Sequence, residues 1–165
     1  MEAKLHRSIR QAIGWYEVIC GGVALLWFGH AAVTTGGAGG WGLVFLGLYA
    51  LMTVAGFRLA LQRSGGGVLS IFVQALQVVR VSTVRFEYLF LAGGAVWGEV
   101  GSHRFGLNPQ INAAFKLKQV SGFGPQFVDQ PWLIGVNLIP LAIVLYLAIM
   151  GRKLANEPEV PLQAS

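Results

Sequence analysis

The chain has 165 residues, of which 55% are hydrophobic and 12% are charged, and its mean hydropathy is +0.61. Because ordinary soluble domains are about 25% charged, this composition argues against a water-soluble globule, a disordered chain and a nucleic-acid-binding domain. The net charge of +5 comes from basic residues that flank apolar segments, so we expect no nucleic acid as a partner. The sequence predicts one polytopic membrane domain over residues 1–153, surrounded by the lipid bilayer.

Two apolar segments near the N-terminus are each long enough to cross a bilayer, which takes about 20 residues. The first covers residues 12–33 and exceeds the roughly 7–15 residues of the apolar part of a signal peptide, so we interpret it as an uncleaved span. The second covers residues 41–61 and begins with Trp41, an aromatic residue typical of the membrane interface. The short glycine-rich connection between them predicts an antiparallel helical hairpin.

The apolar region over residues 68–100 is too long for one straight span, since it would measure about 50 Å as a helix, against a hydrocarbon core of about 30 Å. Its first part is amphipathic, which favours an interfacial or tilted helix over residues 69–81 on the cytoplasmic side. A short third span over residues 86–100 follows in this interpretation. One long helix projecting from the bilayer, or two short spans with an extra crossing, are the alternatives.

The segment over residues 101–131 is polar, and polar and apolar residues alternate between 111 and 118, as in a β-strand. We therefore expect a small β-hairpin-like connector on the outer surface. A fourth span covers residues 132–150, and residues 154–165 form a polar tail that we expect to be disordered. The predicted fold class is an all-α membrane protein with four transmembrane helices, an amphipathic segment before the third, and this connector.

The lysine and arginine residues predict the orientation, because they concentrate on the cytoplasmic side of membrane proteins. Nine of the 12 basic residues lie on one side of the predicted topology: Lys4, Arg7, Arg10, Arg58, Arg63, Arg80, Arg85, Arg152 and Lys153. Three lie on the other side: Arg104, Lys116 and Lys118. This distribution predicts that both termini are cytoplasmic. Four predicted spans in so small a chain are typical of bacterial inner (plasma) membrane proteins, so we expect that location.

Several polar residues inside the apolar segments are candidates for a ligand-binding site, because a polar group in a membrane is costly and is often functional. Glu17 lies in the first span, where it either forms a salt bridge with an arginine (Arg58, Arg80 or Arg85) or belongs to a binding site. The candidate ligand-binding residues are Glu17, Gln74, Gln77, Arg80, Arg85 and Asn137.

Catalytic and metal-binding patterns are missing from the sequence. His30, Glu99 and His103 are the best candidates for metal ligands, but no spacing such as HxxxH supports a metal or a haem, so we expect neither a metal nor another cofactor. The common hydrolase, metalloprotease, phosphate-binding and dinucleotide-binding motifs do not occur either. The sequence therefore favours a protein that is not an enzyme. An oxidoreductase would need a cofactor, and a channel would need a continuous polar pore.

Gly94 and Gly98 form a GxxxG pattern, which lets two membrane helices approach closely. Weaker small-residue pairs are Cys20 with Ala24 and Gly56 with Ala60. The leading hypothesis is a non-catalytic accessory or assembly subunit that acts through helix packing, with a membrane protein or a second copy as its partner. The alternative is binding or transport of a lipid or another small amphiphile by the helix bundle.

Overall fold

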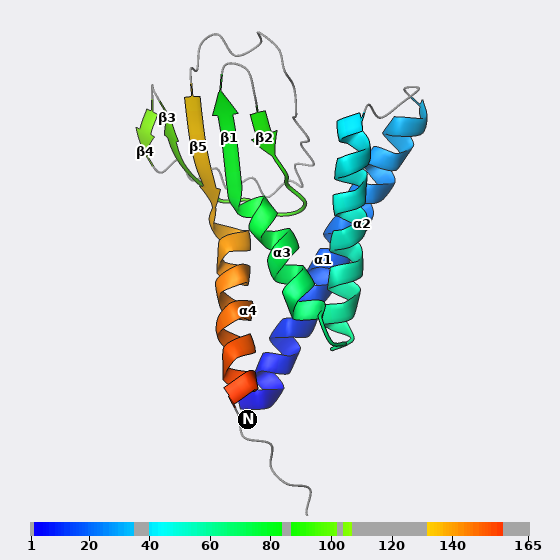
Figure 1. The fold of residues 1–165 in the computed structure, drawn as a ribbon, viewed down its shortest axis with the longest axis vertical. Coiled ribbons are helices and arrows are strands. Elements are labelled where there is room, and N and C mark those ends of the chain that lie inside the picture. The colour runs from blue at the N-terminus through cyan, green and yellow to red at the C-terminus, as the bar shows by residue number, and fades with distance from the viewer. Residues whose placement is uncertain (1, 35–39, 84–86, 102–103, 107–131, 157–165) are drawn as a thin grey trace, which may run out of the picture.

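The computed structural model describes residues 2–34, 40–83, 87–101, 104–106 and 132–156. Within these residues, four helices form an elongated bundle, and a sheet of five strands lies at one end of it (Figure 1). The fold is therefore mostly helical with a small antiparallel sheet. In chain order, the elements are α1 (Glu2–Thr34), α2 (Gly40–Ala60), α3 (Gly66–Val78), β1 (Val79–Thr83), β2 (Glu87–Leu89), β3 (Trp97–Gly101), β4 (Arg104–Gly106), β5 (Trp132–Asn137) and α4 (Leu138–Asn156).

Two of the four described helices are long and apolar enough to cross a bilayer. They are α1, over Lys4–Thr34, and α2, over Gly42–Ala60, and they pack side by side as an antiparallel hairpin (Figure 1). The apolar parts of α3 and α4 are shorter, covering Gly66–Val78 and Leu138–Gly151. The structure thus contains two helices of spanning length where the sequence predicted four.

The α1–α2 hairpin is held together by close contact between backbones. A Cβ atom added at Gly14 would lie 2.5 Å from the Ala60 nitrogen, and one added at Gly56 would lie 2.6 Å from the Gly14 carbonyl oxygen. Only glycine fits at such distances, and small residues are the usual means by which membrane helices approach. The weaker small-residue pair Gly56 and Ala60 therefore packs within the monomer.

The apolar region over residues 68–100 contains one helix and three strands among its described residues. The expected helix over 69–81 is observed as α3, but it packs between α2 and α4 and continues directly into β1. The predicted third span over 86–100 is wrong, because β2, a loop and β3 occupy it. The physical reason is a β-branched, period-two sequence from Val79 onward, followed by Gly93, whose φ of 110° suits glycine alone and no helix.

The five strands form one antiparallel sheet in the order β2-β1-β5-β3-β4. Ile134 of β5 is paired with Val81 of β1 and with Val100 of β3, so apolar residues of three strands share one face. The all-α prediction therefore missed a sheet. β4 and the last residue of β3 fall in the predicted connector, and residues 107–131 of that connector lie outside the described part of the chain.

The predicted fourth span begins six residues too early, because residues 132–137 form β5 and α4 starts only at Leu138. Burial alternates along β5, as expected for a strand with one covered face. Asn137 ends the strand and caps the helix, since its Oδ1 accepts a hydrogen bond from the Ile139 N–H at 3.3 Å. The predicted disordered tail begins at residue 154, inside α4 as observed, and residues 157–165 lie outside the described residues.

The ends of the helices divide between two ends of the bundle (Figure 1). The beginning of α1, the turn between α2 and α3, and the last turns of α4 lie together, while the sheet and the far end of α1 lie at the opposite end. Arg80 belongs to β1 and so lies at the sheet end. It is therefore not on the side of the N-terminus, where the sequence placed it. Arg85 lies outside the described residues.

Candidate functional site

A carboxyl group buried in the bundle joins α1 to α3. Glu17 has no exposed surface, and its Oε1 accepts hydrogen bonds from the Ser70 hydroxyl and from Gln74 Nε2, the latter at 2.9 Å. Its Oε2 has no hydrogen-bond partner among the described residues. Ser70 and Gln74 lie four residues apart and so share one face of α3. This spacing is the signal that could have added Ser70 to the predicted residues.

Among the described residues, the donors to Glu17 are Ser70 and Gln74 and not the expected arginine. The guanidinium group of Arg58 donates to the Ser64 carbonyl at 2.5 and 3.2 Å, so Arg58 stabilises the turn between α2 and α3 instead. Glu17 thus links α1 to α3, but the hydrogen-bond donors are the neutral side chains of Ser70 and Gln74. A carboxyl group that is buried against two such donors serves well as a structural link.

Gln77 is buried on the next turn of α3 but has different partners. Its Nε2 donates to Met52 Sδ at 3.4 Å, and its Oε1 accepts a hydrogen bond from the Ala92 N–H at 3.0 Å. The side chain therefore connects α3, α2 and the loop that follows β2. Gln77 supports this loop and does not share hydrogen-bond partners with Glu17.

Three tyrosine hydroxyls also hold the segments around this loop. Tyr16 accepts a hydrogen bond from the Gly94 N–H at 3.1 Å, and Tyr49 donates to the Leu91 carbonyl at 3.3 Å. Tyr88 of β2 donates to the Leu76 carbonyl at 2.9 Å. Burial raises the pKa of the Tyr88 hydroxyl above its usual value, which keeps this group protonated as a donor.

The predicted helix-packing pair, Gly94 and Gly98, is not on a helix. Gly94 lies in the loop against Tyr16, and Gly98 belongs to β3, where it pairs with Val136 of β5. The assignment of these two glycines to a helix–helix contact is therefore wrong. Glycine at 94 leaves room for Ile139, whose Cδ1 would lie 3.2 Å from an added Cβ.

Asn137 does not belong to the hydrogen-bonded group of Glu17, Ser70 and Gln74; it lies at the junction of the sheet and α4. Its Oδ1 accepts hydrogen bonds from the N–H groups of Val96, at 3.1 Å, and Ile139. The Leu138 N–H donates to the Val96 carbonyl at 2.8 Å, which adds a second bond across the same junction. Asn137 therefore positions the start of α4 against the loop before β3.

Arg80 and Glu99 occupy equivalent positions in the sheet. Both are paired with Gly135 of β5, one from β1 and one from β3, so the two backbone positions flank a glycine on the same face. The five predicted ligand-binding residues that the structure describes thus separate into several places. The structure brings together Glu17 and Gln74, it puts Gln77 one turn farther along α3, and it places Asn137 and Arg80 at the sheet.

The two candidate metal ligands that the structure describes likewise lie on different elements. His30 is exposed near the end of α1, Glu99 belongs to β3, and His103 lies outside the described residues. Among the described residues, no group of three or more histidine, cysteine, aspartate or glutamate side chains is placed to hold a metal ion.

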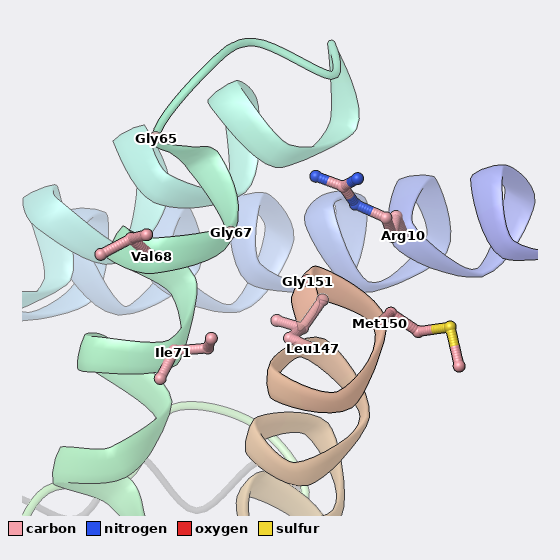
Figure 2. Close-up of a pocket in the computed structure, with 8 residues that line it drawn as sticks. All are labelled: Arg10, Gly65, Gly67, Val68, Ile71, Leu147, Met150 and Gly151. Carbon is pink, nitrogen blue, oxygen red and sulfur yellow. The ribbon is translucent and has the colours of Figure 1, made fainter. Parts of the chain in front are cut away.

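Two hollows on the described surface are lined by residues other than the six predicted ones. The first, which we call the α1 groove, has a volume of about 560 Å³ and lies along the C-terminal part of α1. It is lined by Val23, Leu26, Trp27, His30, Ala31 and Thr34. The second, which we call the Arg10 pocket, has a volume of about 230 Å³ and lies between α1, α3 and α4 (Figure 2). Both belong to the surface of the bundle and not to its interior.

The chain was compared with protein-family models, with curated proteins and with solved structures, and none of the three comparisons gives a match.

Proposed function

We propose that the protein is an integral membrane protein whose α1–α2 hairpin crosses the bilayer. What supports this is the reversed polarity of the bundle. Large apolar side chains are exposed along all four helices, for example Leu26 and Trp27 at 76% and 68%, while Glu17 and Gln74 are buried. Contiguous apolar surface is rare on soluble monomers, whereas ionisable residues in membrane bundles face the interior.

The basic residues support an orientation with the beginning of α1 in the cytoplasm of a bacterial cell. Seven of them lie at or near the end of the bundle that holds the beginning of α1, the α2–α3 turn and the last turns of α4. Arg80 and Arg104 belong to strands at the opposite end. The positive-inside rule then puts the sheet on the outer side of the plasma membrane.

Within that membrane, we propose a non-catalytic role as an accessory or assembly subunit that packs against a helix of a partner protein. The observation that carries this proposal is the α1 groove. Its lining residues recur at helical spacing on a face of α1 that no other described element covers, and it includes the polar side chains of His30 and Thr34. A hollow apolar stripe with a few polar groups fits a neighbouring transmembrane helix.

In this role the contact surface lies on α1 and not at the glycine pair Gly94 and Gly98. Hydrogen bonds to other parts of the chain support a structural role for four of the predicted ligand-binding residues: Glu17, Gln74, Gln77 and Asn137. The hollow stripe on α1 is the part of the bundle that would remain available to a partner helix.

The test is site-specific photocrosslinking in native membranes. The only cysteine of the chain, Cys20, is buried and is replaced by alanine. A single cysteine at Leu26 then carries a benzophenone group, and a single cysteine at Val54 of α2, which is also exposed, is the matched control. We expect a protein adduct of defined mass from position 26 and far less from position 54. Equal yields at the two positions, or lipid adducts alone, would contradict the accessory role.

A further inference from the structure

The Arg10 pocket combines a cationic side chain with apolar walls. Arg10 reaches from α1 toward the space between the beginning of α3 and the end of α4 (Figure 2). The pocket is lined by Arg10, Gly65, Gly67, Val68, Ile71, Leu147, Met150 and Gly151. Ile71 and Leu147 lie between the two helices, one turn deeper than Gly67 and Gly151 (Figure 2).

Arg10 forms no hydrogen bond and no ion pair with another residue in the described part of the chain. This contrasts with Arg58, whose guanidinium group is bonded to the Ser64 carbonyl. The absence of side chains at Gly67 and Gly151 keeps the pocket open beside Arg10. An added Cβ at Gly67 would lie 3.9 Å from the Arg10 guanidinium, and one at Gly151 would have no neighbour within 4 Å.

The size and the position of the pocket narrow the class of ligand. Its volume of about 230 Å³ is below the roughly 300–1,000 Å³ of sites that enclose a whole drug-sized molecule, so it fits part of a larger molecule. It opens at the basic end of the bundle, where the proposed topology places the cytoplasmic headgroups. A cation at headgroup level above an apolar gap complements an anionic headgroup with an acyl chain.

We infer that the Arg10 pocket binds an anionic phospholipid. The phosphate group contacts the Arg10 guanidinium, and a segment of one acyl chain lies between Ile71 of α3 and Leu147 of α4. This inference rests on the membrane location proposed above, but it does not depend on a partner at the α1 groove. The lipid would fill the gap between α3 and α4 at the end where the turn before α3 and the end of α4 leave it open.

The test uses the full chain purified in mild detergent and native mass spectrometry with added lipid. Dioleoylphosphatidylglycerol is the anionic probe, and dioleoylphosphatidylcholine is the zwitterionic control. We expect preferential retention of one phosphatidylglycerol molecule. The Arg10→Gln variant should lower that retention about fivefold, the effect of losing one basic contact at a membrane surface. The matched variant Arg7→Gln removes an equal charge from an exposed position outside the pocket and should change retention much less.

A second variant tests the acyl-chain part of the site while keeping the charge. Gly151→Leu places a side chain in the open space of the pocket and should exclude the chain. Phosphatidylglycerol with a photoreactive acyl chain should label Ile71 and Leu147 in the original chain and lose this labelling in Gly151→Leu. Labelling that is spread evenly over the exposed residues of α1 and α2 would overturn the inference.

Inorganic phosphate distinguishes the source of the anion. If millimolar phosphate displaces phosphatidylglycerol as well as excess lipid does, the pocket is a site for a free anion and the lipid assignment is wrong. Extraction of the protein from membranes by alkaline carbonate would instead refute the membrane location itself. Stable membrane insertion with equal retention of the two lipids would refute only the lipid site.

Discussion

The two halves of the bundle are joined in different ways. In the α1–α2 hairpin, helix backbones meet through Gly14 and Gly56 at distances that leave no room for a Cβ atom. In the half formed by α3, α4 and the sheet, polar side chains such as Gln77 and Asn137 accept hydrogen bonds from backbone N–H groups of the loop between β2 and β3. Close packing of helix backbones therefore stabilises the α1–α2 hairpin. Individual hydrogen bonds, which can be removed one at a time, stabilise the half formed by α3, α4 and the sheet.

The largest expected effect comes from breaking the glycine contact. Gly14→Leu would force the two helix backbones apart, because even a Cβ would lie 2.5 Å from the Ala60 nitrogen. We expect a loss of about 3 kcal/mol or more in unfolding free energy, measured by denaturant titration in detergent micelles. Gly22→Leu is the control on the same helix, since a Cβ there meets nothing within 4 Å. Equal losses in the two variants would show that the hairpin does not depend on this contact.

The buried carboxyl group should give the next largest effect. Glu17→Ala removes the acceptor for Ser70 and Gln74 and leaves two buried donors without a partner, which should cost about 2–3 kcal/mol in unfolding free energy. Glu17→Gln keeps an acceptor oxygen and should retain most of the stability. If the Gln variant is as unstable as the Ala variant, the charge of Glu17, and not its role as an acceptor, is what the fold requires.

Removal of the cap on α4 should have a smaller and more local effect. Asn137→Ala deletes the acceptor for the Val96 and Ile139 N–H groups and should cost about 1–2 kcal/mol. Hydrogen exchange should accelerate at the backbone amides of residues 96, 138 and 139 and remain unchanged in α1. Asn137→Asp keeps the Oδ1 acceptor and serves as the control, so faster exchange there as well would argue against a capping role.

The smallest expected effect is at the link between β2 and α3. Tyr88→Phe removes only the hydrogen bond to the Leu76 carbonyl, and the expected loss is about 1 kcal/mol, detectable as a small decrease in thermal midpoint. Tyr146→Phe is a comparison at the α1–α4 contact, where the hydroxyl lies 3.2 Å from His6 Nδ1. A larger loss for Tyr146 than for Tyr88 would reverse the ranking of the two contacts.

The same contrast explains which parts of the fold were predictable from sequence. Hydropathy and length alone were enough for α1 and α2, because a long apolar segment ended by glycines has few alternatives to a helix. They failed between residues 79 and 100, where an apolar composition is shared by membrane helices and buried strands. The alternation from Val79 to Thr83 and the pair Gly93-Gly94 were the local signals for strands, and total hydropathy obscured them.

The candidate residues show a related limit. Ser70, Gln74 and Gln77 were recognisable as one face of a helix, but their partners on α1 and in the loop after β2 depend on the tertiary fold. The Arg10 pocket was not predictable, because its walls come from helices that are far apart in the chain. Periodicity identifies which residues face inward, whereas a cavity arises from how three helices diverge.

The junctions between helices and strands have a mechanical consequence. α3 ends at Val78 and β1 begins at Val79, while β5 ends at Asn137 and α4 begins at Leu138, so no linker separates either pair. β1 and β5 are also hydrogen-bonded neighbours. A change in the tilt between α3 and α4 must therefore be transmitted to the two strands as a change in their twist. The Asn137 cap, which joins β5 to α4, is a point at which this change would pass from helix to sheet.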